Sequence, residues 1–100
     1  MVWKEELMAM SELNVSGEDV AKVAKALASE TRLQLLKMLS KKTMDVSRIA
    51  SALNQTEANI SAQIKILEKF GLLKSHYEPG EHGVRKVCET AVNKININLL

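Results

Sequence analysis

One stretch near the middle of the chain constrains the fold more than any other feature of the sequence. Residues 45–73 read DVSRIASALNQTEANISAQIKILEKFGLL, and their apolar residues recur every three or four positions. This spacing places apolar side chains on one face of a helix, so it predicts helices over residues 46–53 and 57–70. The predicted inner faces consist of Val46, Ile49, Ala50 and Leu53 in the first helix and Ile60, Ile64 and Leu67 in the second.

Polar residues and a glycine mark where these two helices begin and end. Asp45 and Thr56 each precede a helix and suit the N-cap position, because their side chains accept hydrogen bonds from free backbone N–H groups. Asn54 stands where the chain must turn, and asparagine tolerates the left-handed backbone conformation better than most residues. Gly71 is suited to end the second helix. Two short helices joined by a tight turn indicate a helix-turn-helix.

The outward face of the second helix is small, polar and uncharged. Ala58, Asn59, Ala62 and Gln63 lie on the side away from the apolar stripe. Asparagine and glutamine can each form a pair of hydrogen bonds with an adenine edge in the major groove, and alanine lets a helix approach closely. An ordinary solvated face explains these residues equally well, so this interpretation depends on the downstream sequence.

After the second helix the pattern changes from helix to strand. Residues 72–77 and 84–90 are predicted to be strands, and EPGEHG between them predicts a hairpin tip over 78–83. The hairpin is basic because its tip and base carry His82, Arg85 and Lys86. A basic hairpin directly after a candidate recognition helix is typical of the wing of a winged helix, which contacts a phosphate backbone or an adjacent minor groove.

Two further helices are predicted upstream, over residues 18–28 and 30–40. Ser16 and Ser29 precede them as candidate N-caps. The chain holds only three aromatic residues, so an aliphatic core is expected. The predicted inner faces consist of Val20, Val23, Ala24 and Leu27 in the first helix and Leu33, Leu36 and Leu39, with Leu35 and Met38 beside them, in the second.

Both ends of the chain carry apolar side chains that a winged-helix core does not obviously cover. Residues 2–13 are expected to form a short helix, and residues 93–100 a half-buried strand in which apolar residues alternate with asparagine. The alternative is that the only tryptophan folds back on its own core and that the terminal strand completes the wing sheet. The exposed faces predict a dimer interface made of Trp3, Leu7, Met8, Met10, Ile97 and Leu99.

Charge is distributed unevenly along the chain. Residues 1–20 carry one lysine and five acids, a net of −4, and residues 21–100 carry thirteen cations and seven acids, a net of +6. The positive net charge of residues 21–100 suits a polyanionic partner, and a simple role in solubility explains this charge nearly as well. The single cysteine excludes a disulfide framework, and no stretch has the apolar core of a signal peptide or membrane span. We therefore expect a soluble, cytoplasmic protein.

With these motifs in place, the chain resembles a known family. KALASETRLQLLKML, the stretch over 45–73 and the hairpin that follows are similar to the arsenical-resistance-repressor (ArsR) type of winged helix-turn-helix regulator, over about residues 20–90. Gln63 falls where histidine is common in the recognition helix of that family. The wing segment over residues 80–86, GEHGVRK, looks more like that of archaeal relatives than that of bacterial metal sensors. The resemblance implies a winged helix-turn-helix fold and DNA binding, and it specifies no signal.

The chain departs from the metal sensors that the resemblance brings to mind. Their paired-cysteine motif lies on the helix that corresponds to residues 46–53, which here hold no cysteine and no histidine. Soft metals need several thiolate or imidazole ligands at one site, and the chain offers only Cys88, His76 and His82. We expect no metal and no cofactor. An enzyme is also disfavoured, because there is no glycine-rich phosphate loop and a Cys88–His76 pair would lack an orienting third group.

These observations predict an α+β fold with one winged helix-turn-helix domain over residues 1–100. It comprises an N-terminal dimerisation segment at 1–15, the helix-turn-helix at 45–70, the wing at 72–90 and an extra terminal strand. The predicted function is sequence-specific binding of double-stranded DNA by a homodimeric transcriptional regulator. The alternative is a winged helix used for protein–protein contact in a transcription assembly, since the recognition face carries few cations. The residues expected to contact DNA are Gln55, Thr56, Asn59, Ala62, Gln63, Lys65, His82, Arg85 and Lys86.

Overall fold

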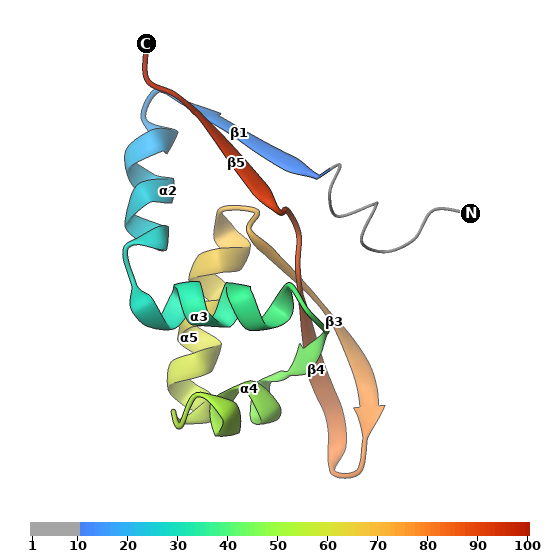
Figure 1. Cartoon of the computed structure of the whole chain (residues 1–100). Coiled ribbons are helices and arrows are strands. Elements are labelled where there is room, and N and C mark those ends of the chain that lie inside the picture. Colours follow the sequence, from blue (N-terminus) through green and yellow to red (C-terminus); the bar gives the residue numbers. More distant parts are fainter. Residues whose placement is uncertain (1–10) are drawn as a thin grey trace, which may run out of the picture.

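The computed structural model describes residues 11–100, which form four helices, a three-stranded sheet and a two-stranded sheet (Figure 1). The helices are α2 (Asp19–Leu27), α3 (Glu30–Leu39), α4 (Val46–Ala52) and α5 (Glu57–Lys69). The strands are β1 (Glu12–Ser16), β2 (Met44–Asp45), β3 (Leu73–Gly80), β4 (Gly83–Thr90) and β5 (Lys94–Asn98). Within this part of the chain no helix is long and apolar enough to cross a membrane.

The helix-turn-helix forms where the sequence predicts it, from α4 to α5. Asp45 and Thr56 cap these helices, each accepting a hydrogen bond from the backbone N–H three residues further on, at 2.8 and 3.0 Å. Asn54 adopts the left-handed conformation in the turn, with a φ of 54°, and Gly71 does so after α5, with a φ of 74°. These four predictions are confirmed, because hydrogen bonds between close neighbours in the sequence decide each of them.

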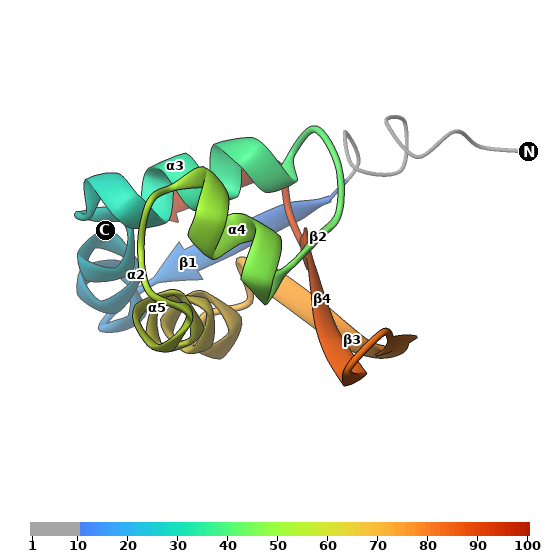
Figure 2. The same cartoon turned by 90° about the horizontal axis from the view of Figure 1, so that it is seen from below.

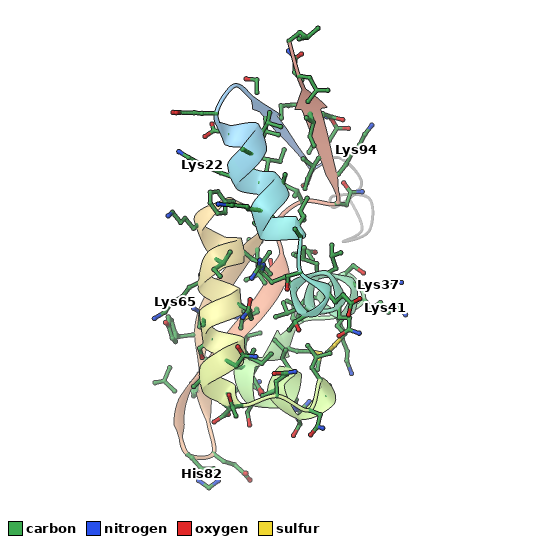
Figure 3. All side chains as sticks on the ribbon, turned by 90° about the vertical axis from the view of Figure 1, so that its left-hand side faces the viewer. Lys22, Lys37, Lys41, Lys65, His82 and Lys94 are labelled. Atoms are coloured by element: carbon green, nitrogen blue, oxygen red, sulfur yellow. The ribbon has the colours of Figure 1, made fainter. Side chains whose placement is uncertain are left out.

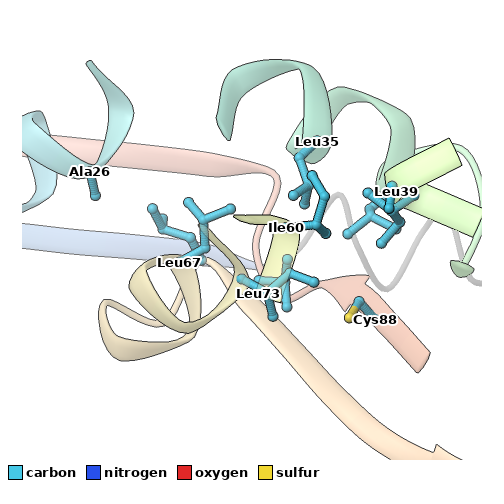
Figure 4. Close-up of a cluster of buried hydrophobic side chains, with 11 residues drawn as sticks. Ala26, Leu35, Leu39, Ile60, Leu67, Leu73 and Cys88 are labelled. Carbon is cyan, nitrogen blue, oxygen red and sulfur yellow. The ribbon is translucent and has the colours of Figure 1, made fainter. Parts of the chain in front are cut away.

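The core lies where α5 packs against α3, α4 and the start of the wing (Figure 4). Ile60, Ile64 and Leu67 are fully buried, so the predicted inner stripe of α5 is confirmed. Leu35 and Leu39 of α3 belong to the same cluster. Each fully buried aliphatic side chain stabilises the fold by about 1.5–3 kcal/mol relative to an exposed one. The stripe therefore holds α5 in one rotational orientation.

The predicted inner faces of α2 and α3 are correct in part. Val23 of α2 and Leu39 of α3 are buried as predicted. In α3, Leu33 is 50% exposed, whereas Leu35 is fully buried and Leu36 is half-buried. In α2, Ala26 is buried in place of Ala24. The leucines of α3 offer two alternative stripes at helical spacing, and only the packing of α3 against α5 and β4 selects between them.

The wing is an antiparallel hairpin made by β3 and β4. The two strands pair along their whole length, and only Glu81 and His82 form the loop between them. The tip predicted over 78–83 is therefore too long, and Pro79 belongs to β3. Proline is tolerated there because β3 is the edge strand of its sheet and needs no backbone donor on its outer side.

A third strand joins the wing sheet from the segment before the helix-turn-helix. β2 pairs with β4 in antiparallel register, opposite Val87 and Cys88, which gives the strand order β2–β4–β3. Because β2 ends at Asp45, the pairing places the cap of α4 directly against the base of the wing.

The two ends of the described chain pair with each other and not with the wing. β1 and β5 run parallel, with Leu13 opposite Ile95 and Val15 opposite Ile97. The predicted terminal strand is thus confirmed, whereas the alternative that it completes the wing sheet is wrong. The architecture as a whole is that of a winged helix-turn-helix with a separate terminal sheet.

Part of the predicted N-terminal helix is wrong as well. Its last residues, 12–13, already belong to β1, because apolar and polar residues alternate there as they do in a strand. Residues 1–10 lie outside the described residues. Ser16 is the last residue of β1 and not a helix cap, and Gly17, with a φ of 59°, turns the chain into α2.

Asp45 connects the helix-turn-helix to the wing. Its Oδ1 caps α4, and its Oδ2 accepts a hydrogen bond from the Arg85 guanidinium on β4 at 2.8 Å. The carboxylate is 10% exposed and the Arg85 side chain 43% exposed. The backbone hydrogen bond from Arg48 is the largest influence on the pKa of Asp45, and Arg85 acts in the same direction. Together they lower this pKa although burial opposes them.

Leu35→Ala should lower the free energy of unfolding by about 2–5 kcal/mol, because it leaves a cavity in the core. Leu33→Ala makes the same chemical change at a position of the same helix that is 50% exposed. It should change the free energy of unfolding by about 0.5 kcal/mol or less. Urea unfolding followed by circular dichroism measures both values. Equal losses in the two variants would contradict the orientation of α3.

Asp45→Asn should destabilise the protein by about 1 kcal/mol at neutral pH, because asparagine can still cap α4 but carries no charge for Arg85. The pKa of Asp45 is lower in the folded protein than its ordinary value of 3.8. Its carboxylate therefore contributes stability above that value, and the contribution is lost as the pH falls through the folded-state pKa. Urea unfolding across this pH range should show the two proteins converging in acid. A difference that stays constant with pH would contradict the role of the charge.

Candidate nucleic-acid interface

The beginning of α5 and the tip of the wing lie at the same end of the molecule (Figures 1 and 3). Figure 2, seen from that end, shows α5 nearly end-on with the β3–β4 hairpin beside it. A groove of about 960 Å³ separates the wing tip from the beginnings of α4 and α5. Its walls include Arg48 on α4, Glu57 on α5 and residues 79–85 of the wing. The helix and the wing are therefore two separate projections with a space between them.

The residues predicted to contact DNA from α5 lie on its outer half or in the turn before it. Figure 3 shows Lys65 on one side of the molecule and Lys37 and Lys41 on the other. Among the described residues, Lys65 has no ion-pair partner. The exposed members of the predicted set are Gln55, Thr56, Ala62 and Lys65, and the half-buried members are Asn59 and Gln63.

Three carboxamide side chains form a chain of hydrogen bonds along α5. Gln63 Nε2 donates to Asn59 Oδ1 at 3.2 Å, and Asn59 Nδ2 donates to Gln55 Oε1 at 2.7 Å. These residues are spaced four apart, so their side chains follow one another along the same side of the helix. We call Gln55, Asn59 and Gln63 the carboxamide ladder. Its bonds hold the three amides in a defined order before any partner arrives.

Sequence reasoning missed the residue at the head of this ladder, Arg32 in the first turn of α3. Its Nη1 donates to Gln63 Oε1 at 2.6 Å. Its Nε donates to the carbonyl oxygen of Ala26 at 2.6 Å, and its Nη2 to that of Lys25 at 3.1 Å, both at the end of α2. No local pattern relates Arg32 to Gln63, because 31 positions separate them.

The cations predicted on the wing are held by acids of the protein itself. Besides the cap of α4, Arg85 contacts Glu78 at 3.1 Å, and Lys86 Nζ donates to Glu68 of α5 at 2.7 Å. Burial is the largest single influence on the pKa of Lys86 and lowers it, but the hydrogen bond and the negative charge of Glu68, with smaller charge effects from Tyr77 and Cys88, together raise this pKa. The Lys86 side chain is only 22% exposed. His82, at the wing tip (Figure 3), and Arg85 are the more accessible of the three predicted wing contacts.

Cys88 is buried in the core and forms no pair with His76. In the hairpin register Cys88 lies opposite Ser75, whereas His76 lies opposite Val87 and bonds to Glu78. Burial raises the pKa of the Cys88 thiol. Cys88 is fully buried and packs in the core as a small apolar side chain. Within residues 11–100, no three side chains of the metal-binding types His, Cys, Asp and Glu gather at one place.

The middle of the chain matches a known protein family. Residues 29–75 match the family described as bacterial regulatory protein, arsR family. This segment comprises α3, the helix-turn-helix and the beginning of the wing. No curated protein sequence matches the chain.

Similar solved structures come from several bacteria. A crystal structure of a possible transcriptional regulatory protein (fragment 1–100) from Mycobacterium bovis is 32% identical, with a TM-score of 0.64 over 74% of this chain and 75% of that chain. A solution structure from the same organism is described as the homodimeric winged helix-turn-helix DNA-binding domain of a possible ArsR-family regulator. It is also 32% identical, with a TM-score of 0.64, and the match spans 74% of this chain and 65% of that one. HlyU from Vibrio cholerae is 25% identical, with a TM-score of 0.64 over 76% of this chain and 82% of that chain.

The family match, the solved relatives and the architecture agree with one another. The reported structures are bacterial and give no support to the expected closeness to archaeal members. The expectation of a regulator and not an enzyme is in line with the family, whose members are DNA-binding regulators. Residues 29–75 match the family, and the chain is 32% identical to a solved relative, of which it covers 75%. This chain therefore belongs to the arsR family of winged helix-turn-helix proteins.

Proposed function

We propose that this chain is a transcriptional regulator that binds double-stranded DNA sequence-specifically as a homodimer. The observation that carries the proposal is the carboxamide ladder, whose exposed end, Gln55, precedes the beginning of α5, and this beginning lies at the same end of the molecule as the wing tip (Figure 1). Family membership supports DNA binding. The homodimeric DNA-binding domain from Mycobacterium bovis supports both DNA binding and the assembly.

In this proposal α5 enters the major groove, and its outer side chains have different roles. The carboxamide ladder offers hydrogen-bonding groups to base edges, which carry the sequence information. Ala62 lets the helix approach closely and can contact thymine methyl groups. Thr56, beside the helix N-terminus, and Lys65, further along the exposed side, contact backbone phosphates. The base contacts then specify a site, and the phosphate contacts set the register.

The wing contacts the phosphate backbone or the minor groove next to the recognition helix. His82 reaches DNA from the exposed tip. Arg85 keeps N–H groups beyond the two that bind carboxylates, so it can contact a phosphate without leaving them. Lys86 binds Glu68 and is less exposed than Arg85, so it is the less accessible contact. Phosphate contacts of this kind position the protein and carry no sequence information.

A second function, protein–protein contact in a transcription assembly, is favoured by the scarcity of cations on α5. Apart from Lys65, the helix carries Lys69, which lies over the ring of Phe70 at 5.6 Å from its centroid. Salt dependence separates the two functions, because phosphate contacts release the counterions of DNA. Titration of the full chain with random duplex DNA at several salt concentrations should show binding that weakens steeply with salt. No binding even at low salt would favour the protein partner.

Asn59→Ala should weaken binding to a preferred duplex by about 1–3 kcal/mol and leave random DNA nearly unaffected, because it removes a contact to base edges. Lys65→Ala, on the same helix, should weaken binding to both duplexes alike and reduce the salt slope by about 1, because it removes a phosphate contact. Fluorescence anisotropy titrations of both duplexes make the measurement. If Asn59→Ala loses affinity equally on both, that residue does not read bases.

The dimer is proposed to use both ends of the chain. On the terminal sheet and just beyond it, Ile97 is 47% exposed and Leu99 is 78% exposed in the single chain. Pairing about a two-fold axis would place two copies of α5 roughly 34 Å apart, which matches one turn of DNA. The remaining members of the predicted interface lie outside the described residues and stay predictions: Trp3, Leu7, Met8 and Met10.

Deleting residues 1–10 should convert the dimer into a monomer and weaken DNA binding, because a monomer contacts only one half-site. The deletion leaves β1 whole, so the fold should persist. Ile97→Ser on β5 is a second variant that should shift the equilibrium in the same direction. Sedimentation velocity at micromolar concentrations measures the assembly. A full-length chain that sediments as a monomer, or a deletion variant that stays dimeric, would contradict the assigned interface.

A further inference from the structure

Arg32 joins three helices through one guanidinium group. It is half-buried in the first turn of α3, and it donates to two carbonyl oxygens at the end of α2 and to Gln63 on α5. Bonds to acceptors on separate elements determine the plane of the guanidinium and therefore the position of the Gln63 oxygen that it binds. The contacts with α2 also satisfy carbonyl groups near a helix C-terminus. The head of the ladder is thus held by the protein framework.

The chemistry of arginine determines the direction of the carboxamide ladder, that is, whether its amides donate toward Gln55 or toward Gln63. A guanidinium has N–H donors and no acceptor, so the atom of Gln63 that faces it must be the carbonyl oxygen. The Gln63 amide nitrogen then faces Asn59 and requires an oxygen there, which turns the Asn59 nitrogen toward the oxygen of Gln55. The bonds of the structure follow this order. Without Arg32 the ladder has two equivalent directions, because a carboxamide can present either atom.

The direction of the ladder decides what its free end offers to a partner. Gln55 uses its oxygen to accept from Asn59, so within the described residues both N–H groups of its amide stay available. Gln55 lies in the turn just before α5, next to the N-terminal end from which recognition helices contact base edges. The exposed end of the ladder therefore presents hydrogen-bond donors.

We propose that Arg32 is a specificity-determining positioning residue, which sets the direction of the carboxamide ladder so that α5 presents N–H donors to base pairs. Base edges rich in acceptors then bind best, and guanine offers two, O6 and N7. Cytosine, whose major-groove group is an amino donor, is disfavoured at the same position. This inference rests on the proposed function, and it adds a preference for guanine at the position that faces Gln55.

Arg32→Gln tests the proposal, because glutamine can donate or accept and no longer imposes a direction. Lys22→Gln is the matched control: it removes the same charge from an exposed side chain on α2 that has no bond to the ladder and lies toward the opposite end of the molecule from His82 (Figure 3). Arg32→Lys keeps a group that only donates. Each full-length protein is used to select duplexes from a random library, and its affinity for random duplex DNA is measured in parallel.

The wild type should select guanine at one position of each half-site, and Arg32→Gln should reduce that preference about fivefold to tenfold. Its affinity for random DNA should fall no further than that of Lys22→Gln. Arg32→Lys should keep more of the guanine preference than Arg32→Gln, a difference that the loss of a purely structural arginine would not produce. Urea unfolding of each variant shows that the selections compare folded proteins.

The side-chain amide signals of the free protein give a second measurement that needs no DNA. In the wild type Gln55 uses only its oxygen in the ladder, so its two amide proton signals should lie near the values of a freely exposed amide in a ¹⁵N-resolved spectrum. Arg32→Gln should shift one of them, because in the reversed direction the Gln55 amide donates to the oxygen of Asn59. This measurement tests the ladder independently of the proposed function.

The possible outcomes separate the two proposals. If Arg32→Gln keeps both the guanine preference and the wild-type amide signals, Arg32 does not set the direction, and the proposed function stands without it. If Arg32→Gln loses affinity equally for all sequences, Arg32 is only a phosphate contact or a structural residue. A wild type that selects adenine at this position would contradict the donor direction. A wild type that selects no sequence would overturn the proposed function and the role of Arg32 in it.

Discussion

Burial of one face of α5 is the interaction on which the rest of the structure depends. Ile60, Ile64 and Leu67 are fully buried against α3, α4 and the wing, and together they contribute several kcal/mol. Because the faces of a helix turn together, this burial also directs Ala62 outward and places Gln63 at the border with α3. A rotation of α5 would expose the apolar stripe, and the net energy of its few polar contacts is too small to drive one.

Charged contacts then position the wing relative to the helices. Arg85 binds the carboxylate that caps α4, and Lys86 binds Glu68 on α5, so the hairpin is attached to both helices of the helix-turn-helix. The cations that a DNA phosphate would contact are the same ones that hold the wing in place. Arg85 has N–H groups left for a phosphate, so DNA can bind there while the wing stays attached, which links the position of the wing to the proposed binding of DNA.

Much of the fold follows from patterns within a few residues, and the errors occur where two such patterns compete or a distant segment decides. Caps, left-handed turns and the stripe of α5 were predictable because each depends on neighbours within one or two helical turns. Leu33 and Leu35 lie on alternative stripes of α3, and packing buries only Leu35. Leu13 continues a predicted helix by pattern but joins a strand, because Ile95 from the far end of the chain pairs with it.

The sequence by itself determined the helix-turn-helix, the hairpin that follows it and the small polar surface of the recognition helix, because periodicity, caps and glycines act locally. Only the tertiary structure decided that Arg32 heads the carboxamide ladder, that acids hold the cations of the wing, and that the chain ends form a sheet of their own. The physical reason is the same in each case. These contacts join side chains or strands from segments far apart in the chain, and no local pattern contains the distances between them.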